Sequence, residues 1–257
     1  MSTDLFPGDG DLYRGFTYND IAAGEVKGLS LSPTSASDNT VGLGFKTVWA
    51  PATSWVRPLA TEQLQIVSDD VADTAAAGVG ARAAAVTYLR DDYTPITEIV
   101  TLNGTTPVTL LNTDPWRVID TRVTLAGSTD SNVGTISLSG VTSGDPWDCI
   151  EPGRGICTSS VTTIQAGFKL YLHGAIVTTL DTTKIVTTRL VSGRAGDPML
   201  ERRRFESVEL RDYVPVGILF EEGDDVAVEA MVSTGSAVLH LDPVGVVIDI
   251  KRFRSTS

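Results

Sequence analysis

Cysteine is scarce in this sequence. Of its 257 residues, two are cysteines, Cys149 and Cys157, and both lie in the stretch DPWDCIEPGRGICTS. This stretch offers too few ligands of the right kind for a zinc site. The residues between the two cysteines include Pro152, Gly153 and Gly155, so a small disulfide loop is feasible in oxidising surroundings, whereas a reducing cytoplasm favours free thiols. We therefore expect free thiols or a late disulfide, no metal and no other cofactor.

Long hydrophobic runs are absent as well. No apolar stretch approaches the roughly 20 residues that cross a bilayer. The first residues, MSTDLFPGDGDLYRG, carry acids in place of the apolar core of a signal peptide. These features predict a protein made in the cytoplasm, with no membrane partner.

Basic residues are fewer than acidic residues. The chain has 20 Lys and Arg against 32 Asp and Glu, a formal net charge of −12, and a sequence pI of about 4.5. An acidic surface repels phosphate backbones, so we expect no nucleic acid as a principal partner. Two basic clusters, residues 202–204 and 251–254, are interpreted as solvated surface or as members of ion pairs.

Helix signals are limited to one short candidate around Tyr18 to Val26. Elsewhere Thr and Val dominate runs of residues that are bounded by Gly, Pro, Asp and Asn, a pattern typical of short strands. Several runs alternate apolar and polar residues; for example, Phe168, Leu170 and Leu172 share one face of their strand. Strands with one polar face belong to antiparallel sheets, so the sequence predicts an all-β chain built as an antiparallel β-sandwich or jelly roll.

The pattern divides the chain into four parts. Residues 1–45 are rich in Gly, Ser and Asp and predict an extended N-terminal arm that lies on a partner surface. Residues 46–145 predict a first β-sandwich domain, residues 146–160 a connecting loop, and residues 161–257 a second β-sandwich domain. The alternative, one larger sandwich, stays open because the two halves show no strong internal repeat.

One stretch predicts a hairpin especially clearly. In TEIVTLNGTTPVTLL, residues 97–102 and 106–111 flank the dipeptide Asn103-Gly104. Asn-Gly accepts the positive φ angles of a tight two-residue turn. The sequence therefore predicts two antiparallel neighbours joined at Asn103 and Gly104, a structural turn with no reactive group nearby.

Groups for catalysis are few. The two histidines, His173 and His240, each fall within a strand pattern. No nucleophile elbow and no phosphate-binding loop is present. Paired acids at 91–92 and 224–225 could serve glycoside hydrolysis, but Asp is also a favoured turn residue. We expect no enzyme, and keep a hydrolase that uses two of these acidic loops as the weakest alternative.

The four tryptophans are the best candidates for ligand or partner contacts. They are Trp49, Trp55, Trp116 and Trp147, and they lie beside Pro, Gly or Asp. Tryptophan in loops can stack on sugars or anchor a protein interface. The competing interpretation is that these rings close the ends of a sandwich.

Three runs, sharpest over residues 70–140, share a pattern with one protein family. They are Asp73-Thr74-Ala75-Ala76 with Gly78, Gly80, Ala81 and Arg82; Glu98, Val100 to Thr105 and Val108; and Gly127-Ser128 with Asn132, Gly134 and Ile136. They resemble a family of tailed-bacteriophage virion structural proteins. The preceding KTVWAP resembles the short V-W segment of that family. IQAGFKLYL and ILFEEGDDVAVEAMV match the family more loosely, because Gln165 and Phe220 stand where it has proline.

The resemblance implies a component of the virion, with no catalytic residues to carry over. The first hypothesis is a capsid decoration (cement) or other head-associated protein. It would form a homo-oligomer, with a trimer favoured at capsid three-fold positions, and would contact other virion proteins such as the major capsid protein or tail and neck proteins. The second hypothesis is a tail or fibre component that binds a host surface glycan or protein through its tryptophan-bearing loops.

Overall fold

The computed structural model describes residues 29–31, 36–50, 55–76, 78–179, 184–207 and 211–249, which form 17 strands. All strand pairings between these residues are antiparallel, as predicted. No described residue is helical, so this part of the chain holds no helix that could cross a membrane. The helix predicted around Tyr18 to Val26 lies outside the described residues. The all-β prediction is confirmed.

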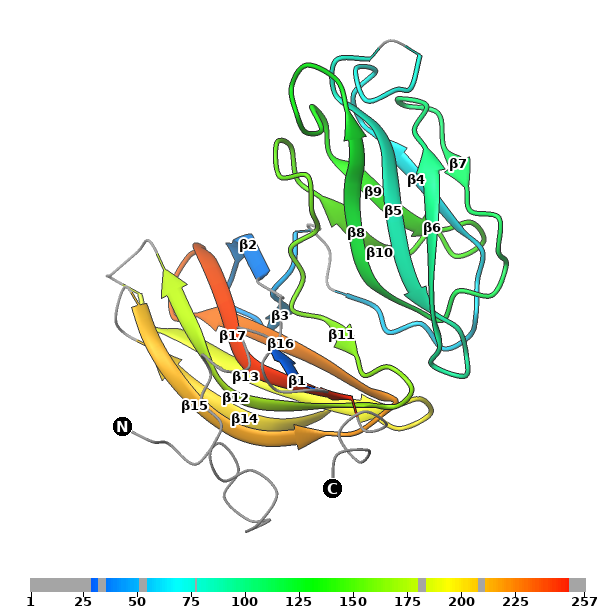
Figure 1. Cartoon of the computed structure of the whole chain (residues 1–257). Helices are drawn as coiled ribbons and strands as arrows, with labels where there is room; N and C mark the ends of the chain where they lie inside the picture. The colour runs from blue at the N-terminus through cyan, green and yellow to red at the C-terminus, as the bar shows by residue number, and fades with distance from the viewer. Residues whose placement is uncertain are drawn as a thin grey trace.

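The strands fall into two groups, visible as separate bodies in Figure 1. The first unit has a four-stranded sheet, in the order β10-β9-β4-β7, and a three-stranded sheet, β6-β5-β8. Its strands are β4 (Leu64–Ser68), β5 (Ala81–Leu89), β6 (Pro95–Thr101), β7 (Val108–Thr109), β8 (Arg117–Ala126), β9 (Ile136–Gly140) and β10 (Pro146–Ile150). Leu64 and Ile136 of one sheet pack with Val86 and Tyr88 of the other in one buried core. The two sheets therefore face each other as a sandwich.

The second unit combines both ends of the described chain. One sheet has the order β1-β17-β12-β15, with β2 also paired to β17; the other has the order β11-β16-β13-β14, with β3 also paired to β16. The strands are β1 (Leu29–Leu31), β2 (Ala36–Val41), β3 (Lys46–Thr47), β11 (Thr162–Thr163), β12 (Phe168–Thr179), β13 (Val186–Arg194), β14 (Leu200–Ser207), β15 (Arg211–Phe220), β16 (Asp224–Val232) and β17 (Ala237–Asp249). Val177 of β12 and Val186 of β13 meet in a core between the sheets.

Three boundaries differ from the predicted division. Residues 29–41, assigned to the arm, pair with β17 as β1 and β2, and Val41 is fully buried in the core of the second unit. β3, assigned to the first domain, pairs with β16 of the second unit. β10, assigned to the connecting loop, pairs with β9. These short strands pair because a neighbouring edge is available, which local composition does not reveal.

The hairpin prediction is wrong in its pairing. β6 pairs with β5, while β7 pairs with β4 of the other sheet, so the chain changes sheets at this turn. Gly104 has a φ of +59°, as a turn glycine requires, but Asn103 does not have positive φ. Its backbone forms a β-bridge with Thr74, and the Gly104 N–H donates to the Asp73 carbonyl at 2.8 Å. Contacts with the preceding loop overrode the local hairpin signal.

The edge strand β14 accounts for the basic cluster at residues 202–204. Arg204 donates to both oxygens of Glu201, at 3.1 and 2.6 Å, and the Arg202 Nε donates to Ser192 Oγ at 2.7 Å. Charged side chains on an exposed edge discourage pairing with another chain. The other basic cluster, residues 251–254, lies outside the described residues.

Candidate functional site

Asp73 is the centre of a buried polar cluster in the loop between β4 and β5. This loop, cyan in Figure 1, lies at the end of the first unit away from the second unit. Its carboxylate accepts hydrogen bonds from Ser68 Oγ at 2.7 Å and from the N–H of Ala81 at 2.7 Å. It also accepts from the N–H groups of Val133 at 2.9 Å and Gly134 at 2.8 Å. Four donors satisfy a charge that would otherwise be costly to bury. The Asp73 carboxylate thus joins the loop before β5 to the loop before β9.

Glycines of the same motifs stand where a side chain would collide. A Cβ on Gly80 would overlap the Asp73 carboxylate, and a Cβ on Gly127 would lie 2.5 Å from the Gly78 carbonyl oxygen. The Gly127 N–H donates to the Gly80 carbonyl at 2.7 Å. These glycines allow two backbones to approach closely, which is a packing role.

Asn132 joins this cluster to the chain that leaves β10. Its Nδ2 donates to the carbonyls of Gly134 at 2.7 Å and Glu151 at 2.8 Å, and its Oδ1 accepts from the Gly155 N–H at 3.0 Å. The Gly153 N–H donates to the Asn132 carbonyl at 2.9 Å. The side chain is 2% exposed, so its amide replaces backbone partners that a loop would otherwise lack.

Glu98 holds the chain that follows the turn at Gly104. It accepts hydrogen bonds from Tyr88 Oη at 2.6 Å, from Asn112 Nδ2 at 2.8 Å and from the Leu111 N–H at 2.8 Å. Burial acts to raise the pKa of Glu98, but these hydrogen bonds outweigh it and the pKa is lowered. Asp73, Asn132 and Glu98, one polar residue from each of the three motifs, are therefore centres of hydrogen-bond networks within the first unit.

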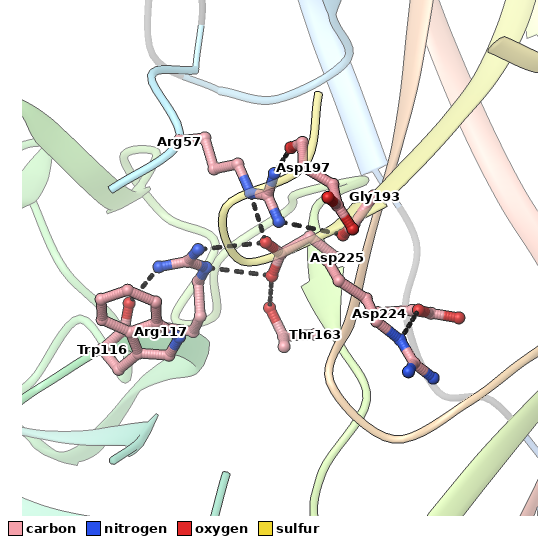
Figure 2. Close-up of polar contacts among 9 residues, drawn as sticks. Arg57, Trp116, Arg117, Thr163, Gly193, Asp197, Asp224 and Asp225 are labelled. Atoms are coloured by element: carbon pink, nitrogen blue, oxygen red, sulfur yellow. Dashed lines mark hydrogen bonds and ion pairs between the residues drawn. The ribbon is translucent and has the colours of Figure 1, made fainter. Parts of the chain in front are cut away.

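A second cluster joins the two units, and Figure 2 shows it. Asp225, at the start of β16, is 1% exposed. Its carboxylate accepts Arg117 Nε at 2.9 Å and Nη2 at 3.0 Å, and Arg57 Nε at 2.6 Å. Thr163 Oγ1 donates to it at 2.6 Å. Because Arg117 belongs to β8 of the first unit, this buried ion pair fixes the two units to each other.

Both guanidinium groups also donate to backbone carbonyls. Arg57 donates through Nη1 to Asp197 at 2.5 Å and through Nη2 to Gly193 at 3.0 Å. Arg117 donates through Nη1 to the Trp116 carbonyl at 2.7 Å, and its guanidinium lies 4.4 Å from the centre of the Trp116 ring. Carbonyl dipoles and the ring face offset the second positive charge. The cluster is complete without a ligand, and we interpret it as structural.

The connecting segment, residues 151–161 between β10 and β11, forms backbone hydrogen bonds with β8. The Val123 N–H donates to the Gly155 carbonyl at 2.8 Å, and the Cys157 N–H donates to the Thr121 carbonyl at 2.9 Å. Farther along, Ser160 Oγ donates to the Val228 carbonyl of β16 at 2.9 Å. The segment therefore contacts both units through hydrogen bonds along its length.

A turn of the first unit also fits against the second. Tyr93 has a φ of +61°, and its carbonyl accepts the Ala166 N–H at 3.0 Å. A Cβ on Gly223 would lie 3.1 Å from the Tyr93 ring, and Gly223 has a φ of +81°. A bulky residue with positive φ is rare, and here contacts from the second unit hold it.

Three of the four acids considered for hydrolysis have structural partners. Asp92 Oδ1 accepts the Thr94 N–H at 2.9 Å. Asp224 pairs with Arg194 at 2.9 Å, and Asp225 is occupied by the two arginines. Among the described residues, no group of three or more His, Cys, Asp or Glu is placed to hold a metal ion. His173 and His240 lie in strands β12 and β17, as the pattern indicated.

The four tryptophans do not form one surface. Trp49 is fully buried and Trp147 is 7% exposed in the core of the first unit. Trp55 and Trp116 are half-buried. Two of the four candidates therefore serve as core residues, which leaves only Trp55 and Trp116 with surface for a partner.

Cys149 and Cys157 are free thiols. Burial raises the pKa of Cys149 to about 12 and raises that of Cys157 well above its usual range. Because the thiolate is the reactive form, neither is an activated nucleophile. Burial also raises the pKa of the neighbouring Asp148 carboxyl to about 6.

Sequence reasoning did not identify Arg57 and Arg117 as interface residues. Each lies in an ordinary local context, VRP and PWRV, and their common partner is far along the chain. Asp225 was assigned to a turn. A signal in the sequence was the position of Asp225 at the start of a strand pattern. A charge buried there would be costly without a partner, which indicates a cation elsewhere in the chain.

No family model matches this sequence. No curated protein matches it. Solved structures that resemble it include a structure of infectious bursal disease virus strain Gt, 11% identical, covering 87% of this chain and 73% of that chain at a TM-score of 0.23. A VP2 subviral particle of the same virus is 13% identical, with coverage of 89% and 74% and a TM-score of 0.23.

Proposed function

We propose that this chain is a structural component of a tailed-bacteriophage particle, most specifically a capsid decoration or other head-associated protein. It would assemble as a homotrimer and stabilise the particle through contacts with other virion proteins. The observation that carries the proposal is the convergence of the resembling motifs on hydrogen-bond networks around Asp73, Asn132 and Glu98. The residues that carry the resemblance connect the loops of the first unit through hydrogen bonds, and they bring no reactive groups together.

The contact between the units supports the same proposal. A cement protein has to transmit force between neighbouring subunits, which requires its parts to keep a fixed relative orientation. Asp225 with Arg57 and Arg117 provides a buried, directional contact of this kind, and the hydrogen-bonded connecting segment adds a second. Separating the partners of a buried ion pair leaves buried charges uncompensated, which is strongly unfavourable. The relative orientation of the two units is therefore fixed.

Particles assembled with and without this protein test the proposal. We expect particles that lack it to lose their contents at lower temperature or under milder osmotic shock, and purified protein added back to restore the stability. The Asp225→Ala variant serves as a second arm, because it is expected to bind but to stabilise less. Equal stability of both particle preparations would contradict a cement role.

A receptor-binding tail or fibre component is the second candidate, and Trp55 and Trp116 are its remaining support. It predicts that isolated protein binds host cells or a glycan array, and that Trp55→Ala abolishes binding. Trp147→Ala is not an informative variant, since that side chain is buried in the core.

A further inference from the structure

A cavity of about 380 Å³ lies between the two units. Its wall is built from β8, β10, β11, β12, β17 and the segment between β10 and β11. It includes the apolar side chains of Trp55, Val118, Ile156, Phe168, Leu170 and Val247. Small-molecule sites commonly have volumes of this order and lie between domains, with mostly apolar walls and a few polar groups. Arg117 and Thr163 belong both to this wall and to the Asp225 cluster, where each already donates to the Asp225 carboxylate.

The positive charges of the wall are paired. Each of its three cationic side chains has an acidic partner: Arg117 with Asp225 at 2.9 Å, Arg122 with Asp120 at 3.4 Å and Lys169 with Glu221 at 2.8 Å. A ligand that brings an anion would have to break one of these pairs. The wall therefore does not favour carboxylate or phosphate ligands.

One acid of the wall has no such partner. Asp148 of β10 is 5% exposed and lines the cavity, and its Oδ1 accepts the Cys149 N–H at 2.9 Å. No Lys, Arg or His among the described residues forms an ion pair with it. A buried carboxylate without a cation is unfavourable, and a cation placed beside it would remove that cost.

We propose that this cavity binds a small organic amine whose ammonium group pairs with Asp148 and whose aromatic or aliphatic body packs against the apolar wall. The Trp55 ring offers a second contact for the cation. A neutral molecule of the same shape would fill the cavity and leave Asp148 unpaired, and an acid of the same shape would be repelled. The inference does not depend on the role proposed for the particle.

The test is calorimetric titration of the full chain at pH 7.5 with phenethylamine, 2-phenylethanol and 3-phenylpropionate. We expect saturable binding of the amine, binding of the alcohol weaker by about tenfold, and no binding of the acid, since a hydrogen bond to a charged group contributes about 1.5 kcal/mol or more. Asp148→Asn is expected to abolish the preference for the amine over the alcohol. Asp145→Asn, an exposed acid just before the same strand, is the matched control and is expected to bind as the unaltered chain does.

Ile156→Phe provides a variant that does not alter the acid. Ile156 is 48% exposed, so a larger side chain is tolerated there and should reduce the cavity volume, weakening binding of amine and alcohol alike. The proposal is overturned if the amine shows no saturable binding, if amine and alcohol bind equally, or if Asp148→Asn keeps the preference. Undiminished amine binding by Ile156→Phe would also overturn it, because the amine would then lie elsewhere.

Discussion

Asp73 and Asp225 are two carboxylates that the fold removes almost entirely from water, and they are compensated in different ways. Asp73 accepts hydrogen bonds from a hydroxyl and three backbone N–H groups, all within the first unit. Asp225 faces two guanidinium groups and a hydroxyl, and one of those guanidinium groups comes from the other unit. The first acid organises local loops, whereas the second fixes the two units to each other.

The difference indicates which consequences a change at each acid should have. Without Asp73, neutral donors remain buried and unpaired, so the damage should stay within the first unit. Without Asp225, two positive charges remain at the contact between the units, so the damage should reach both sides.

The largest effect is expected at Asp225. Asp225→Ala should lower the free energy of unfolding by about 4 kcal/mol, because it leaves Arg57 and Arg117 buried without a counter-charge. Hydrogen exchange should then accelerate at β8, β11 and the start of β16 together. Asp224→Ala removes the partner of the exposed Arg194 and should cost about 1 kcal/mol or less. Equal effects of the two variants would contradict the assignment.

Asp73→Ala should cost about 3 kcal/mol, since several buried N–H groups lose their acceptor. Hydrogen exchange should accelerate at Ala81, Val133 and Gly134 and remain unchanged in β12 to β17. Asp91→Ala, a change at an exposed acid of the same unit, is the control. Faster exchange in the second unit would remove the distinction between the two acids.

Gly127→Ala tests the close backbone approach next to Asp73. Its Cβ would lie 2.5 Å from a carbonyl oxygen, and we expect a loss of about 2 kcal/mol from overpacking. Gly44→Ala is the matched control, because no atom lies within 4 Å of the Cβ it would add. The comparison is made by denaturant unfolding, and a neutral Gly127→Ala would show that the loops adapt.

The smallest effect, and the only stabilising one, is expected at Asp148, the buried acid without a cation. In the folded state its pKa is raised from 3.8 to about 6, so the folded state binds more protons than the unfolded state does. The contribution of this acid to the free energy of unfolding therefore falls as pH rises from about 4 through 6. Asp148→Asn removes that loss, and its advantage over the unaltered chain should grow by about 1 kcal/mol between pH 5 and pH 7.5. Thermal unfolding at both pH values measures this. An advantage that shrinks with pH would contradict the raised pKa.

Local patterns predicted the strands but not their partners. The alternation of Phe168, Leu170 and Leu172 predicted one buried face correctly, since all three contribute to or pack on one core. In β8 the pairing with β5 shifts register, so Val118 and Val123, five residues apart, both pack on the core. A strict alternation would have put these two on opposite faces.

The candidate sites were harder to predict, for a physical reason. Asn103-Gly104 predicted a hairpin because a two-residue turn depends on local φ angles alone, but the chain that follows is held by Glu98 and pairs with β4. The contact between Arg117 and Asp225 spans more than one hundred residues and depends on how two sandwiches pack. No local pattern encodes that packing.

The location and copy number of the protein in purified particles test the central claim most directly. Quantitative mass spectrometry and imaging of labelled particles would supply both. Decoration of every three-fold position by a trimer predicts a head position and a copy number equal to that of the major capsid protein, and decoration of a subset of these positions predicts a simple fraction of it. A few copies confined to the tail, or absence from purified particles, would contradict it.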